Sequence, residues 1–133
     1  MKKFGKEISE ALHKDKTIDM VMIGAKSGKI RTTEIWFTRI HDRIIICGTP
    51  AAEGGSGPHK PRHWLANLKA NPEFVFCLKE SIKAELPARA VIITDPDDRL
   101  MLMSAPATHW YRSQVNSVEE LVKYSPIVEV FFA

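Results

Sequence analysis

The hydrophobic pattern of the first fifty residues predicts one short helix followed by three strands. Residues 4–12 place apolar side chains at intervals of three and four, which is typical of a helix with one apolar face. Residues 18–23 are apolar and β-branched, and residues 32–40 alternate between polar and apolar, so these two segments predict a hairpin. A turn at residues 41–43 then leads into a third strand at residues 43–47.

The rest of the chain predicts a long loop, more strands and short helices. Residues 48–61 contain four glycines and three prolines, which interrupt any helix or strand and predict a functional loop. Pro87 lies inside a long predicted strand and indicates a bulge or an edge position. The predicted elements after the loop are a helix from Pro61 to Asn71, strands at 74–79 and 82–93, a helix capped by Asp95, a helix at 117–123 and a strand at 126–132.

This order of elements predicts the fold class. About six strands follow one another mostly as hairpins, with short helices at the periphery, so we expect a mainly β, mostly antiparallel barrel. A chain of 133 residues is long enough to bury one core, and we expect a single domain over residues 1–133. A doubly wound nucleotide-binding sheet does not fit this order.

Composition narrows the function without naming it. No apolar run approaches the length of a membrane helix, and the N-terminus lacks the apolar core of a signal peptide, so we expect a cytoplasmic protein with no membrane span. The net charge of +3 is too small to indicate nucleic-acid binding by itself.

Cys47 and Cys77 lie in apolar runs and are interpreted as buried thiols. Pro61 separates His59 from His63, so no metal site is expected.

The stretch from Gly24 to Arg39 carries the strongest chemical signal. Lys26, Lys29 and Arg31 can give charge-assisted hydrogen bonds to a phosphate, and neighbouring hydroxyls add neutral donors. Gly24 and Gly28 allow a concave row of backbone amides that binds anions. A solvated basic hairpin loop explains the same residues equally well.

Known phosphate motifs do not match this stretch. A P-loop has four residues between its first glycine and Gly-Lys-Ser/Thr, whereas three separate Gly24 from Gly28, and a strand rather than a helix follows. No nucleophile-elbow motif is present either. A basic turn, a glycine-rich loop and a helix bearing Trp64 together suit a phosphorylated aromatic cofactor, which a protein mainly positions and shields.

The sequence also resembles a known family. The motifs are Gly24-Ala-Lys-Ser-Gly-Lys-Ile-Arg-Thr-Thr33, Asp42-Arg43, Gly54-Gly55 and Trp64-Leu-Ala-Asn-Leu-Lys-Ala-Asn-Pro72. They are similar to the deazaflavin (F420)-dependent nitroreductase family, a branch of the split β-barrel flavin and deazaflavin oxidoreductases related to pyridoxamine 5'-phosphate oxidase. The match covers about residues 18–93 well. Glu34 stands where the family usually has proline, and this change could redirect the strand or place a negative charge near the site.

The resemblance implies a function and a set of site residues. Reduced F420 would give hydride to a small acceptor such as an enone, a quinone or a nitro compound, and Tyr111 would protonate or orient that acceptor, with Tyr124 as the second candidate. An ordinary packing role explains either tyrosine equally well. A homodimer is plausible for a split barrel. The residues implied to bind the cofactor are Lys26, Ser27, Gly28, Lys29, Arg31, Thr32, Thr49, Gly54, Gly55, Trp64 and Asn67.

Three alternatives stay open at this point. The cofactor could be FMN on the same barrel, because FMN also presents a phosphate. The chain could bind a flavin or another small ligand without catalysis, since hydride transfer between aligned partners asks little of side chains. A nucleic-acid-binding barrel is the third, because Trp36, Trp64 and Trp110 could stack on bases.

Overall fold

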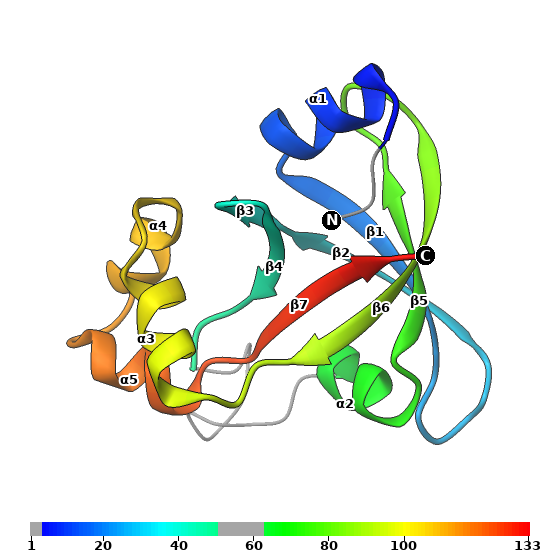
Figure 1. The fold of residues 1–133 in the computed structure, drawn as a ribbon. Helices are drawn as coiled ribbons and strands as arrows, with labels where there is room; N and C mark the ends of the chain where they lie inside the picture. Colours follow the sequence, from blue (N-terminus) through cyan, green and yellow to red (C-terminus); the bar gives the residue numbers. More distant parts are fainter. Residues whose placement is uncertain (1–3, 51–62) are drawn as a thin grey trace.

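The computed structural model describes residues 4–50 and 63–133, and within them the chain forms one curled antiparallel sheet with helices around it (Figure 1). The strand order is β2-β1-β5-β6-β7-β4-β3. The strands are β1 (Thr17–Ile23), β2 (Ile30–Trp36), β3 (Thr38–Ile40), β4 (Arg43–Cys47), β5 (Glu73–Leu78), β6 (Ala84–Ile92) and β7 (Ile127–Phe132). The expected fold class, a mainly β split barrel with mostly antiparallel strands, is confirmed.

The sheet must curl because its two edge strands are neighbours in sequence. β2 and β3 lie at opposite edges, yet Phe37 alone separates them along the chain. One residue spans about 3.5 Å, so the two edges meet at this point and the sheet bends into a barrel. The Phe37 amide donates to the carbonyl of Lys16 at 2.8 Å, and its ring is buried. We expected residues 32–40 to form a single strand; the break at Phe37 makes the count seven instead of six.

Helices cover both ends and one side of the sheet. In Figure 1, α1 lies at one end of the barrel, α2 lies at the other, and α3 to α5 form a group beside β4 and β7. The helices are α1 (Lys6–Lys14), α2 (His63–Ala70), α3 (Pro96–Ser104), the 3-10 turn η1 (Pro106–Thr108), α4 (His109–Arg112) and α5 (Val118–Tyr124). The predicted cap of α3 is present, because Asp95 Oδ2 accepts from the Asp98 amide at 2.9 Å.

Two apolar clusters hold these layers together. Alternate residues of β1, Ile18, Met20 and Met22, are buried in the main core with Phe76 and the inner faces of α1 and α2. A second cluster packs α3 to α5 against β4 and the start of β7. Neither cysteine forms a disulfide: Cys47 is buried, as predicted, whereas Cys77 is only partly buried.

Pro87 lies on an inner strand, so the predicted bulge or edge strand is wrong. The pairing of β5 with β6 is continuous through Val75 and Pro87. The Pro87 carbonyl accepts from the Ala133 amide at 3.0 Å, and a residue's N–H and C=O point to the same side of a strand. The missing N–H of Pro87 therefore faces Ala133 at the end of the β6–β7 ladder, so the proline removes at most the last hydrogen bond of that ladder.

Candidate functional site

The basic turn between β1 and β2 is held in place by hydrogen bonds to itself and to α2. The Gly24 amide donates to Lys29 O at 2.7 Å, and the Gly28 amide donates to Gly24 O at 3.0 Å. Gly28 has φ of +68°, which an L side chain resists. A Cβ at Gly24 would lie 2.6 Å from Ser27 Oγ, so the backbone here is closed tightly around the serine.

The same hydrogen bonds exclude the expected row of anion-binding amides. The amides of Gly24, Ala25, Gly28 and Lys29 all donate inside the protein. Ala25 donates to Asn67 Oδ1 at 2.9 Å, and Lys29 donates to Ser27 Oγ at 3.2 Å. These four amides are therefore not free for an anion, so the expected amide row is absent and the side chains are the donors that the turn can offer.

Three cations surround the turn without carboxylate partners. Lys26, Lys29 and Arg31 are exposed, and none forms an ion pair with any residue in 4–50 or 63–133. The Arg31 side chain passes over Gly24, since its Cγ would lie 3.5 Å from a Cβ there. Arg31 Nη1 makes one long hydrogen bond, 3.5 Å to Ile30 O. The turn therefore presents positive charge that the described protein does not neutralise.

Strand register separates two of the predicted binding residues. Arg31 pairs with buried Met22, and Thr32 pairs with Val21. Successive side chains point to opposite faces of a strand. Arg31 therefore lies on the inner face of the sheet near the turn, whereas Thr32 lies on the outer face.

Glu34 neither bends β2 nor adds charge to the turn. β2 continues through it, paired with Asp19 of β1. Lys79, directly after β5, donates to Asp19 Oδ1 at 2.9 Å and also to Glu34, and these hydrogen bonds raise the pKa of Lys79. The glutamate thus belongs to an ion-pair ladder on the outer face.

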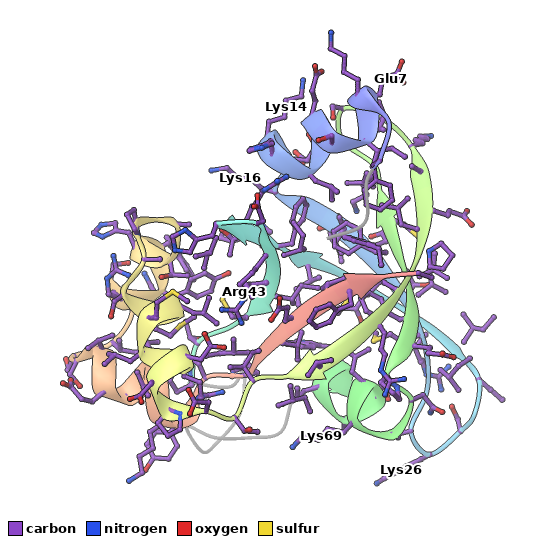
Figure 2. All side chains as sticks on the ribbon, viewed as in Figure 1. Glu7, Lys14, Lys16, Lys26, Arg43 and Lys69 are labelled. Carbon is purple, nitrogen blue, oxygen red and sulfur yellow. The ribbon has the colours of Figure 1, made fainter. Side chains whose placement is uncertain are left out.

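Helix α2 supports the turn from one side. Asn67 makes the hydrogen bond to Ala25, while Trp64 is 6% exposed and packs in the main core. Lys69, which sequence reasoning did not single out, projects from the same end of the molecule as Lys26 (Figure 2). Residues two apart lie on opposite sides of a helix, so the position of Lys69 relative to Asn67 in the motif gave no local signal for it.

The remaining predicted residues lie elsewhere. Thr49 follows β4, where the Gly48 amide donates to Pro126 O at 3.1 Å, and Gly54 and Gly55 lie outside the described residues.

Tyr111, in α4, is 8% exposed and packs in the second cluster. It lines a cavity together with Trp36, at the end of β2 away from the turn. Six residues at about 3.3 Å each separate Ile30 from Trp36, so Tyr111 and the turn are about 20 Å apart along the strand.

The turn has the chemistry that a phosphorylated cofactor needs. Ser27 and three cations that have no carboxylate partner within residues 4–50 and 63–133 supply donors, and Asn67 fixes the backbone that carries them. No three His, Cys, Asp or Glu side chains converge on a metal-binding geometry in the described part of the chain. Nor is any helix there long and apolar enough to cross a membrane.

Solved structures with the same fold define the class. The chain is similar to a conserved hypothetical protein from Mycobacterium tuberculosis, with 14% identity, TM-score 0.68 and coverage of 99% of this chain and 82% of that one. It is similar to an F420 reductase at 15% identity and TM-score 0.62, covering 94% and 92% of the two chains. An F420H2-dependent reductase matches at 19% identity and TM-score 0.53, covering 88% and 95%. The fold is therefore the split barrel that such reductases adopt.

The family follows from the sequence itself. Residues 1–122 match the model of the F420H2-dependent quinone reductase family, and the chain belongs to that family. The match extends well beyond the residues 18–93 on which the resemblance was based. No curated protein matches the sequence. The chain is thus an oxidoreductase with F420 as its cofactor, acting on a small molecule.

Proposed function

We propose that the chain transfers hydride from reduced F420 to a small quinone and binds the cofactor phosphate at the basic turn. The observation that carries the site is the group of Lys26, Lys29 and Arg31, which meet no carboxylate among the described residues. The acceptor class is supported by the name of the family. F420, when bound, supplies the hydride.

The protein's own contribution is binding and orientation. Lys29 and Arg31 would hold the phosphate from two sides of the turn, and Ser27 would donate its hydroxyl. Asn67 keeps Ala25 at a fixed place against α2, so the turn is ordered before the cofactor arrives. Thr49, Gly54, Gly55, Trp64 and Thr32 stay predicted neighbours of the cofactor.

A calorimetric titration with F420 tests the phosphate site. Losing one charge-assisted contact at an exposed site costs about 1–2 kcal/mol, so Lys29→Ala and Arg31→Ala should each weaken binding by roughly 5- to 30-fold. Lys83→Ala is the matched control, because it removes one exposed lysine from the β5–β6 turn and should change nothing. Equal affinity in all four proteins would place the phosphate elsewhere.

The acceptor and the role of Tyr111 need a kinetic test. With menadione as the quinone, Tyr111→Phe should lower kcat and leave F420 affinity unchanged if the hydroxyl protonates or orients the acceptor. Tyr124→Phe tests the second candidate in the same assay, since that ring is 43% exposed in α5. Unchanged turnover in Tyr111→Phe would leave the tyrosine with a packing role in the second cluster.

We also propose a homodimer, and a cytoplasmic location stays a prediction. One similar solved structure is described as a domain-swapped dimer, at 19% identity and TM-score 0.54. In this chain Val91 and Phe131 lie on the outer face of β6 and β7 and are 42% and 48% exposed. Light scattering on the purified protein distinguishes a dimer of about twice the 15.0 kDa chain mass from a monomer.

A further inference from the structure

A cavity of about 460 Å³ opens at the end of the barrel opposite the basic turn. Its walls are residues 12–16 at the end of α1, residues 36–39 around the β2–β3 junction, and Ala107, Trp110 and Tyr111. Figure 2 shows Lys14 and Lys16 at this end, well separated from Lys26 and Lys69. The volume falls in the range of small-molecule sites.

Two indole rings form the aromatic side of the cavity. The ring centroids of Trp36 and Trp110 are 5.5 Å apart at an interplanar angle of 68°, and Tyr111 meets Trp110 edge-on at 5.2 Å. Trp36 is 50% exposed and Trp110 is 48% exposed. Half-exposed aromatic rings at the wall of a cavity gain free energy when a flat apolar ligand covers them.

The polar side of the cavity is cationic. Lys14 at the end of α1 and Lys16 just beyond it are exposed in this wall, beside the exposed imidazole of His13. The one carboxylate in the wall, Asp15, is 8% exposed and accepts from both the amide and the hydroxyl of Ser81, at 3.2 and 2.8 Å.

The nearby Glu80 carboxylate is also committed to the protein. It accepts from the Lys16 and Thr17 amides at 2.6 and 2.7 Å, which lowers its pKa. Both carboxylates thus already accept hydrogen bonds from the protein. The lysines of the wall can therefore pair with an anionic ligand.

Arg39 gives this wall a buried donor. Its side chain is 13% exposed; Nε donates to His41 O at 3.4 Å, and Nη2 donates to Asp42 Oδ1 at 3.2 Å. Nη1 is buried and has no hydrogen-bond partner among the described residues. Arg39 lines the cavity, and its one carboxylate partner among the described residues is the exposed Asp42, so its positive charge would attract an anionic ligand in the cavity.

We propose that this cavity binds a small aromatic carboxylate, with its ring against Trp36 and Trp110 and its carboxylate at Arg39 and the α1 lysines. The cavity lies about 20 Å along β2 from the phosphate site and contains Tyr111, the residue proposed above to meet the hydride acceptor. Aromatic surface and positive charge together select this ligand class, because a neutral aromatic leaves the cations of the wall without an anion and a simple anion leaves the indoles uncovered.

Calorimetric titration with 2-naphthoate and its neutral isostere 2-naphthamide tests the proposal. We expect 2-naphthoate to bind the wild-type protein at least tenfold more tightly than 2-naphthamide. Arg39→Gln should remove most of that difference, and Trp110→Ala should weaken both ligands. Arg89→Gln, which removes an exposed cation on the outer face of β6, is the control and should leave both affinities unchanged.

The outcomes separate this site from the cofactor site. F420 affinity should be unaffected by Arg39→Gln, and 2-naphthoate affinity should be unaffected by Lys29→Ala. Equal binding of the two naphthalenes, or loss of 2-naphthoate binding in Lys29→Ala, overturns the proposal. If Arg39→Gln fails to fold by circular dichroism, Lys14→Ala takes its place: a reduced preference for the carboxylate supports the site, and an unchanged preference refutes it.

Discussion

The hydrogen bond between Asn67 and Ala25 joins the basic turn to α2, and Asn67→Ala tests whether this link prepares the turn for its ligand. Loss of a hydrogen bond costs about 1 kcal/mol. Alanine is a better helix former than asparagine by up to about 0.7 kcal/mol, and Asn67 lies inside α2. The two terms nearly cancel, so we expect the free energy of unfolding to fall by less than about 0.5 kcal/mol.

Binding should respond more strongly than stability. If F420 must order the turn of the Asn67→Ala variant as it binds, its affinity should fall by about 1 kcal/mol, or roughly fivefold. Hydrogen exchange at the Ala25 amide provides an independent readout and should become faster. Asn67→Asp is the matched variant: it keeps an oxygen acceptor but adds a negative charge beside the cations, so amide protection should remain while affinity falls. Faster exchange at Ala25 with unchanged F420 affinity would refute the reasoning.

Three further predictions concern the scaffold. Asp98 accepts two hydrogen bonds from Arg43, at 2.7 and 2.8 Å, and these lower the pKa of Asp98. The ionised Asp98 carboxylate therefore contributes its full stabilisation above its ordinary pKa of about 3.9, and this stabilisation is lost as the pH falls through the lower folded-state pKa. In Asp98→Asn, the Tm should therefore decrease less steeply as the pH is lowered. Gly28→Ala should cost about 1 kcal/mol in urea denaturation, because φ is +68° while no other atom lies within 4 Å of the added Cβ; an unchanged midpoint would contradict the strain argument. Burial, followed by nearby carboxylates, raises the pKa of Cys77, so mass spectrometry should find it alkylated by iodoacetamide more slowly at pH 8 in the native than in the urea-unfolded protein.

Local pattern predicted most of the elements, since they depend on residues close in sequence. The strand at 43–47 has the predicted bounds, and the Asp95 cap is present, because both are signalled within a few residues. The break at Phe37 was missed because it depends on the carbonyl of Lys16 across the barrel. Pro87 was misplaced for a similar reason: only the end of β7 reveals that its missing N–H falls at the last position of the ladder.

The sequence predicted which candidate residues lie near one another better than it predicted how they are arranged. The cations at 26, 29 and 31 and the link from Asn67 lie together, as one motif-rich region indicated. Alternation along β2 places Thr32 and Arg31 on opposite faces of the sheet, which the strand pattern alone could have shown. The expected amide row is absent because its N–H groups donate to Asn67, to Ser27 and within the turn itself. The cavity at Arg39 joins three distant segments, and no local pattern reveals that.

The central claim is that the basic turn binds the phosphate of F420. The most direct measurement is a double comparison: wild-type and Lys29→Ala proteins, each titrated with F420 and with a deazaflavin analogue that lacks the phosphate. The account predicts that Lys29→Ala weakens F420 binding by about 5- to 30-fold and leaves the affinity for the phosphate-free analogue unchanged. An equal loss for both ligands, or no loss for F420, would contradict it.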